Sequence, residues 1–176
     1  ARESESDNEA LYHIAVTTGM RQGEIFGLKW SDLQWHSGIL SVQRQVKRPT
    51  GQGWIFAPPK TKSGVRTIQL GEGVLHALRR HKVNQDTLIS VHADKWQENN
   101  LLFTNSIGNP LDGSNLRKDF YRILDTAGLP KIRFHDLRHT AASLMLNNGI
   151  DLIVVSKILG HSKPSVTMDI YGHLLP

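Results

Sequence analysis

The sequence has 176 residues, 39% of them hydrophobic and 21% charged, a balance typical of one globular domain with a hydrophobic core. It contains no cysteine, which excludes disulfide frameworks, thiolate zinc sites and thiol nucleophiles. No apolar run approaches the roughly 20 residues that a membrane helix requires, and no secretory signal is visible. The 21 basic residues outnumber the 16 acidic ones, and this excess favours a polyanionic partner such as nucleic acid.

Helical periodicity and turn residues organise the start of the chain. Residues 1–10 are polar and are interpreted as a linker. Apolar residues in EALYHIAVTTG recur at helical spacing, and Gly19 follows the last of them, which predicts a helix that ends at this glycine. RQGEIFGLKW predicts a second short helix with Ile25 and Leu28 turned inward, and the following SDLQWHSG is typical of a turn.

Alternation of apolar and polar residues predicts a β region between Ile39 and Leu70. ILSVQRQVKR and VRTIQL both alternate, and GWIFAPP is interpreted as a strand between them. TGQG and TKSG separate the three runs and contain residues that favour tight turns. The sequence therefore predicts a three-stranded antiparallel sheet, with Lys62 at the tip of a hairpin.

From Gly71 onward the pattern is mainly helical. EGVLHALRRHKV places apolar residues on one side of a helix: Val74, Leu75, Leu78 and Val83. LLFTNSIGNPLDGS is interpreted as a short strand followed by a loop. Apolar residues in NLRKDFYRILDTAG again recur at helical spacing, and Gly128 ends this element.

Three short helices are expected in the last part of the chain. HDLRHTAASLMLNNG turns Leu137, Ala141 and Leu144 toward the core. Asp151 caps LIVVSKIL, which ends at Gly160, and KPSVTMDIYGHL begins with a proline in its first turn. The whole pattern predicts a mainly α fold with a small three-stranded antiparallel β-sheet.

Six polar side chains stand out against this pattern, although each has an ordinary explanation. His135 and Arg138 share a helix face that solvent can cover. Arg21 lies at a helix N-terminus, which is unfavourable for a cation, and Glu24 can form a surface pair with it. The other three lie in a turn, after a helix end and in a polar tail: Lys62, His161 and Tyr171.

Taken together, the six side chains form the set needed to attack a phosphodiester without a metal. Two arginines can clamp the non-bridging oxygens and stabilise the charge that develops on phosphorus. A tyrosine hydroxyl can act as the nucleophile and form a covalent intermediate. A histidine can assist removal of the phenol proton, and a lysine can protonate the departing sugar oxygen.

Four segments carry a resemblance to a known family: TTGMRQGEIFGLKWSD, KTKSGVRTIQL, HDLRHTAASLML and ILGHSKPSVTMDIYGHLLP. They occur in the family's order and cover nearly the whole chain, and the H-x-L-R-H element followed by L-G-H and a tyrosine is specific. The sequence resembles the catalytic domain of the tyrosine recombinases, the phage integrase family. Its style is closest to integrases of temperate phages and conjugative transposons.

The resemblance implies a role for each of the six side chains. Arg21 and Arg138 match the two catalytic arginines, and Tyr171 matches the nucleophile. Lys62 matches the catalytic lysine, with Lys60 as its rival. The remaining two match the active-site histidines: His135, which is expected to exchange protons with Tyr171, and His161, which is expected to hold the phosphoryl oxygens.

Two further positions match supporting residues of the family. Glu24 matches a supporting acidic position, and His139, the last histidine of H-x-L-R-H, is interpreted as structural. The interval from His161 to Tyr171 is one residue longer than in many members, as is common in transposon-type integrases.

The resemblance also implies partners and organisation. We expect double-stranded DNA at attachment sites as the substrate, no cofactor, no metal and no ATP, and a bacterial cytoplasmic, nucleoid-associated protein. Residues 1–176 are interpreted as one excised catalytic domain that lacks the N-terminal DNA-binding domains. This fragment is expected to be a monomer in solution and a homotetramer on DNA when full-length. Trp54, Arg66 and the hairpin around Lys62 are expected to approach the duplex.

Other functions are compatible with parts of the same pattern. A type IB topoisomerase shares the chemistry and differs by relaxing supercoils instead of joining partner strands. A non-catalytic DNA-binding module would need the polar set only to grip phosphate. A histidine-based metal hydrolase would need ligands at a spacing such as H-E-x-x-H, which is absent from the sequence.

Overall fold

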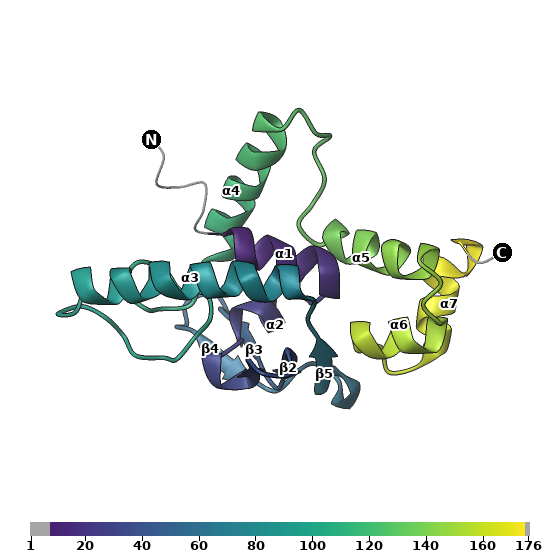
Figure 1. The fold of residues 1–176 in the computed structure, drawn as a ribbon, viewed down its shortest axis with the longest axis horizontal. Helices are drawn as coiled ribbons and strands as arrows, with labels where there is room; N and C mark the ends of the chain where they lie inside the picture. The colour runs from purple at the N-terminus through teal and green to yellow at the C-terminus, as the bar shows by residue number, and fades with distance from the viewer. Residues whose placement is uncertain (1–7, 175–176) are drawn as a thin grey trace.

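The computed structural model describes residues 8–174, and Figure 1 shows their arrangement. Most of the polar segment interpreted as a linker lies outside the described residues. Helix α1 (Glu9–Thr18) ends at Gly19, whose φ of 62° is left-handed, as the sequence predicts. Three residues separate α1 from helix α2 (Gln22–Phe26), and the short 3-10 helix η1 (Trp30–Asp32) comes next.

The β region forms two sheets, which corrects the predicted strand order. Strands β1 (Leu33–Gln34), β2 (Ile39–Val42) and β5 (Arg66–Gln69) make a three-stranded antiparallel sheet with β2 in the middle. Strands β3 (Gln45–Lys47) and β4 (Ile55–Ala57) pair only with each other. The segment expected to be a turn therefore supplies β1, and GWIFAPP does not join the main sheet. The 3-10 helix η2 (Lys62–Gly64) connects β4 to β5.

A buried ion pair explains why residues 39–48 form two strands instead of one. The guanidinium of Arg44 bonds both carboxylate oxygens of Asp32 and also donates to the carbonyl oxygen of Gly27. Asp32 is buried, so a charged partner must reach it. Arg44 lies two residues after the end of β2, and its bonds to this carboxylate hold the chain at the point where β3 leaves the sheet.

Five helices complete the fold: α3 (Glu72–Val91), α4 (Gly113–Thr126), α5 (Asp136–Asn147), α6 (Leu152–Leu159) and α7 (Pro164–Tyr171), with the 3-10 turn η3 (Gly172–Leu174) after them. The predicted cap of α6 is confirmed, because the Asp151 carboxylate accepts from the amide of Ile153 at 2.7 Å. In the segment expected to be a short strand, residues 101–110 form only isolated β-bridges.

Two apolar residues predicted to face the core are exposed instead. Val83 is 65% exposed on the distal part of α3, and Leu144 is 50% exposed on α5. On α5 the buried face is made by Arg138, Ala141, Ala142, Met145 and Leu146. The prediction from apolar periodicity placed this face wrongly, because it assigned Arg138 to the solvent-facing side of the helix. The Arg138 side chain is buried in the structure.

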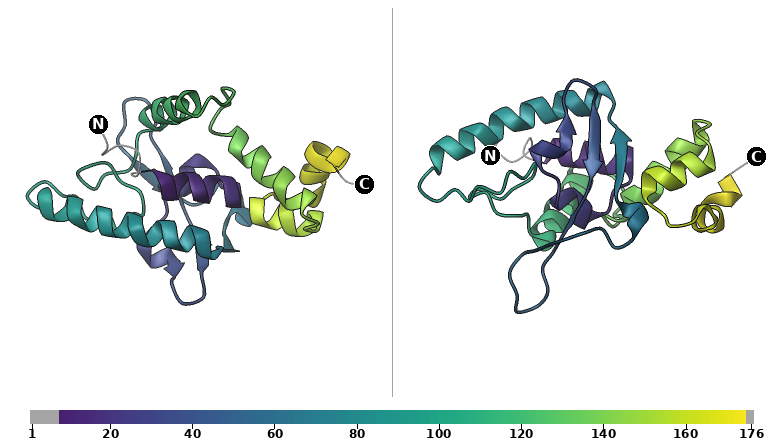
Figure 2. Two further views of the ribbon diagram at one scale, coloured as in Figure 1. Left: turned by 45° about the horizontal axis from the view of Figure 1, so that its top comes forward. Right: turned by 90° about the horizontal axis from the view of Figure 1, so that it is seen from below.

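The buried apolar side chains form two clusters. The larger joins α1, α2, α3 and α4 to the main sheet. The smaller joins α5 and α6 to the ring of Tyr171, and Ile158 of α6 packs against both clusters. Figure 2 shows α5, α6 and α7 grouped at one end of the molecule, beside α1 and β5. The predicted fold class is confirmed, and among residues 8–174 no helix is long and apolar enough to span a membrane.

We expect Gly19→Ala to destabilise the fold more than Gly51→Ala. Both glycines have a positive φ, so either substitution costs about 1–2 kcal/mol in backbone strain. A Cβ atom at Gly19 would also lie 2.6 Å from Cδ2 of Leu159 and 3.2 Å from Cβ of Ala141, whereas the position at Gly51 is open. The added overpacking costs about 1–3 kcal/mol. Urea denaturation of both variants measures the difference, and equal losses would contradict this account of the α1–α6 contact.

Candidate active site

Arg138 joins three helices through its buried guanidinium. Its Nη1 donates to the carbonyl oxygen of Gly19 at 2.6 Å, and its Nη2 donates to the carbonyl oxygen of Leu159 at 2.9 Å. These carbonyls lie at the C-terminal ends of α1 and α6, where helices leave acceptors unpaired and where cations are favourable. Burial and the charge of Arg21 lower the pKa of Arg138 to about 10, so it remains protonated at neutral pH.

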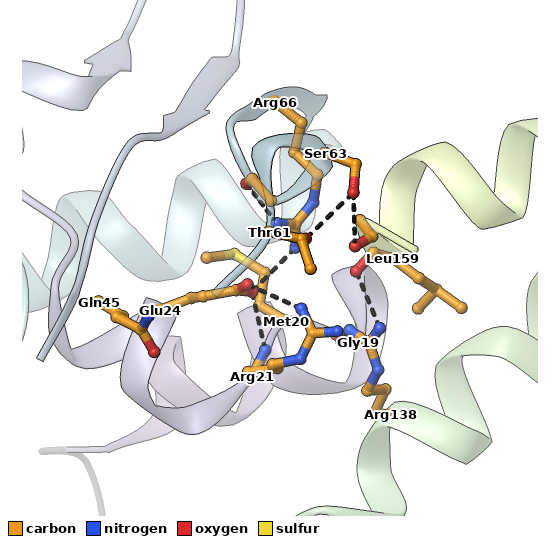
Figure 3. Close-up of polar contacts among 12 residues, drawn as sticks. Gly19, Met20, Arg21, Glu24, Gln45, Thr61, Ser63, Arg66, Arg138 and Leu159 are labelled. Atoms are coloured by element: carbon orange, nitrogen blue, oxygen red, sulfur yellow. Dashed lines mark hydrogen bonds and ion pairs between the residues drawn. The ribbon is translucent and has the colours of Figure 1, made fainter. Parts of the chain in front are cut away.

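Glu24 is shared between two further arginines, as Figure 3 shows. Its Oε1 accepts from Nη1 of Arg21 at 3.0 Å, and its Oε2 accepts from Nη2 of Arg66 at 3.0 Å and from the amide of Arg21 at 3.1 Å. Glu24 is only 2% exposed. Burial raises its pKa, but the hydrogen bonds and charges of Arg66 and Arg21 outweigh this and lower it below the ordinary value. The carboxylate is therefore ionised and fixes the Arg21 side chain, which keeps 34% of its surface exposed.

His161 follows the left-handed Gly160 that ends α6, in the place that the sequence predicts. Its Nδ1 lies 2.7 Å from the hydroxyl oxygen of Thr167, a fully buried residue of α7. Burial, followed by the positive charges of Arg138, Arg21 and Arg66, lowers the pKa of His161 to about 4. The imidazole is therefore neutral at pH 7, and a Thr167 hydroxyl that donates to Nδ1 leaves the proton on Nε2.

The hydroxyl of Tyr171 lies 2.7 Å from Nδ1 of His139, a contact that the sequence analysis did not anticipate. His139 was expected to be structural, with His135 as the group that exchanges protons with the tyrosine. Instead the ring of His139 neighbours both side chains, with its centroid 5.7 Å from that of His135 and 5.8 Å from that of Tyr171. Burial raises the pKa of Tyr171, although Arg138 opposes this, so the phenol is protonated at neutral pH.

The predicted site residues gather around Arg138, with Lys62 at a less direct position. Arg21, His135, His161 and Tyr171 all interact electrostatically with its guanidinium. His135 lies just before α5 with part of its surface exposed. Partial desolvation of the ring, followed by the charge of Arg138, lowers its pKa. Lys62 begins η2 and is exposed, but the hydroxyl of the next residue, Ser63, lies 3.4 Å from the carbonyl oxygen of Gly160. The lysine segment thus reaches the end of α6 that carries His161. Its rival Lys60 is also exposed.

Sequence reasoning did not anticipate the internal contacts of Arg66 and missed Thr167. Arg66 was expected to approach DNA, and its side chain is 7% exposed and turned into the site. Thr167 carries no charge and lies in a short helix, so nothing in the pattern distinguishes it from a core threonine. The sequence offers one indication that Arg66 belongs to the site: it is a basic residue in a predicted strand, close to the turn that carries Lys62.

The arrangement is suited to an anion with several oxygens. Three guanidiniums surround a single buried carboxylate, so the cluster keeps a net positive charge. Arg138 uses two of its five N–H groups on carbonyls, and Arg21 uses one on Glu24, which leaves donors on both side chains for a ligand. Across residues 8–174, no group of three or more histidine, aspartate and glutamate side chains is arranged to hold a metal ion. Phosphate is the ligand that such a cluster of arginines and neutral imidazoles fits.

Comparison with known proteins identifies the family. Residues 2–176 match the phage integrase family, and the chain belongs to it. The tyrosine recombinase XerC-like protein of Caldanaerobacter subterraneus is 37% identical over 96% of this chain and 46% of its own length. The ICEBs1 integrase of Bacillus subtilis is 30% identical over 96% of this chain and 45% of its own length. The chain thus spans about half the length of the curated relatives that it matches.

The fold also matches a solved DNA complex. The Tn1549 transposon integrase in complex with transposon right-end DNA superimposes with a TM-score of 0.82 and 27% identity. The match covers 97% of this chain and 56% of that one. The resemblance stated from sequence is therefore confirmed at the level of family and fold.

We expect the imidazole of His161 to titrate near pH 4, below its ordinary 6.5, because burial and three guanidiniums disfavour its charged form. Between about pH 6.5 and about pH 4 the unfolded chain binds a proton at this ring that the folded chain does not. This group therefore lowers the unfolding free energy as the pH falls through that interval. Proton–carbon NMR of the ring measures the midpoint, with the urea-unfolded chain as control. A folded midpoint at or above 6.5 would contradict the described burial.

Proposed function

We propose that residues 1–176 form the catalytic domain of a site-specific DNA recombinase that integrates or excises a mobile element. The observation that carries this proposal is the pairing of a net-positive arginine cluster, with donors to spare, and a buried tyrosine hydroxyl held by a histidine. Its relatives support it by name, since they include integrases of mobile elements. DNA supplies the phosphate, and the tyrosine supplies the nucleophile.

Binding of the scissile phosphate uses Arg21, Arg138 and His161. Arg21 and Arg138 donate to the non-bridging oxygens from the N–H groups that they do not use internally. His161 donates from Nε2 as a neutral imidazole, because its lowered pKa keeps it unprotonated. All three groups are fixed before the substrate arrives, so little reorganisation is needed as charge builds on phosphorus.

The chemical step exchanges one phosphoester for another. The Tyr171 oxygen attacks phosphorus and forms a 3′-phosphotyrosine bond, while the bond from phosphorus to the 5′ oxygen breaks. The phenol proton passes to Nδ1 of His139, the nearest base, with His135 beside it. Lys62 protonates the departing 5′ oxygen. The 5′-hydroxyl of a partner strand then reverses the step, so the bond energy is retained and neither ATP nor a metal is consumed.

The proposal extends to the assembled protein. Recombination of two duplexes requires four such sites, so we propose a homotetramer on DNA for the full-length protein and a monomer for this domain alone. Binding should depend strongly on salt, because phosphate contacts dominate it. The proposed place of action is the bacterial cytoplasm, where the nucleoid lies.

We expect Tyr171→Phe to abolish covalent attachment to DNA while leaving DNA binding nearly unchanged, because only the nucleophilic oxygen is lost. The substrate is a pool of duplexes with a randomised central segment and a nick within it. The short released fragment diffuses away, so the covalent product accumulates and can be captured and sequenced.

Mass spectrometry of the trapped product locates the modified residue, and Tyr12→Phe is the matched control. Covalent product on Tyr171→Phe, or an adduct on another residue, would overturn the nucleophile assignment. Relaxation of supercoiled DNA without partner-strand joining would favour a type IB topoisomerase.

We expect Lys62→Met to slow cleavage by about 10²-fold or more, because a general acid is lost. A substrate with sulfur in place of the departing 5′ oxygen needs no such proton, so it should restore the rate. Lys60→Met is the control and should cleave both substrates at the wild-type rate. If Lys60→Met shows the defect that sulfur rescues, Lys60 is the acid and Lys62 is not.

A further inference from the structure

Arg66 contacts three separate parts of the site through three different nitrogens. Its Nε donates to the carbonyl oxygen of Ile158 at 2.6 Å, its Nη1 to that of Gly64 at 2.8 Å, and its Nη2 to Oε2 of Glu24 at 3.0 Å. These contacts engage all three guanidinium nitrogens of Arg66, whereas two are engaged in Arg138 and one in Arg21, so Arg66 is the least suited of the three to bind phosphate.

These contacts cross from one hydrophobic cluster to the other. Arg66 belongs to β5 of the main sheet, and Glu24 belongs to α2, which carries Arg21 at its N-terminus. Ile158 belongs to the last turn of α6, three residues before His161. Arg66 therefore connects the element that fixes the first arginine to the element that presents the histidine.

The packing around Gly160 shows that the guanidinium occupies a fitted space. A Cβ atom at Gly160 would lie 2.9 Å from Nη1 and 3.1 Å from Cζ of Arg66. The carbonyl oxygen of Ser63, the residue after Lys62, lies 3.2 Å from the same position. The lysine segment (Lys62–Gly64), the end of α6 and the guanidinium of Arg66 thus meet at Gly160.

We propose that Arg66 is a positioning residue that sets the distance between Arg21, His161 and the lysine segment, and that it does not contact DNA. The inference rests on the proposed function, because the distance matters only if these groups hold one phosphate. A displacement of about 1 Å in a catalytic group can cost about 10²-fold in rate. Lysine cannot replace Arg66, because one ammonium group cannot reach the carboxylate and both carbonyls from the same place.

The test compares Arg66→Lys with Arg44→Lys in the whole chain. Arg44 makes the same kind of contact, to the buried carboxylate of Asp32 and a backbone carbonyl, but none of these partners belongs to the proposed site. Both variants keep the positive charge and lose a guanidinium fork. The probe is the nicked duplex selected by the wild-type chain, at saturating protein in single-turnover conditions.

We expect Arg66→Lys to form the covalent product about 10²-fold more slowly than wild type, with an unchanged dissociation constant for the duplex. Arg44→Lys should lose comparable stability in urea and react close to the wild-type rate. Equal rates for Arg66→Lys and wild type would overturn the inference, as would equal defects in the two variants. If the wild-type chain forms no covalent product on any duplex, the proposed function fails instead.

Double substitution provides an independent check with a variant of the shared carboxylate. Glu24→Gln should reduce the covalent rate, and adding Arg66→Lys to it should reduce the rate little further, because both act through one network. Multiplicative effects of the two substitutions would mean that Arg66 does not act through Glu24, and would overturn that part of the inference.

Discussion

The structure depends on one buried guanidinium that ties two hydrophobic clusters together. Arg138 lies on α5, a helix of the smaller cluster. It donates across the junction of the two clusters to the end of α1, and within the smaller cluster to the end of α6. Burying a charge is costly unless its donors are satisfied. Two carbonyl oxygens satisfy only part of this guanidinium, and the depressed pKa of Arg138 reflects the remaining cost. An anion bound at the junction would accept hydrogen bonds from the remaining donors of Arg138 and offset the cost of burying its charge.

Burial and the same excess of positive charge determine the protonation state of the other groups. Burial first, and then the three guanidiniums, lower the pKa of His161, so this ring is neutral at physiological pH, and burial raises the pKa of Tyr171, whose phenol is protonated. Neutral imidazoles suit a site where one ring donates a hydrogen bond and another accepts a proton. Local rules of charge pairing are broken at this cluster, as is common at sites where a bound ligand completes them.

Local features of the fold could be predicted from the sequence, and long-range polar contacts could not. The left-handed Gly19 and Gly160 and the Asp151 cap follow from short patterns, because neighbouring residues decide them. The predicted order of strands in the sheet was wrong because Arg44 bonds to the carboxylate of Asp32, twelve residues earlier in the sequence. The family motif indicated the six polar residues, but not that Arg138 is buried or that the His139 ring meets Tyr171 across 32 residues. Such contacts leave no periodic trace in a sequence.

The residues of the proposed site are distributed over the two hydrophobic clusters. Tyr171 and its partner His139 both belong to helices of the smaller cluster, so their contact survives a shift of this cluster against the main body. The proposed phosphate clamp spans the junction, since Arg21 precedes α2 whereas Arg138 lies on α5. A small rotation at the junction would therefore separate the two arginines while leaving Tyr171 in contact with His139. Bonds from Arg138 to Gly19, from Arg66 to Ile158 and from Ser63 to Gly160 cross the junction and oppose such a rotation.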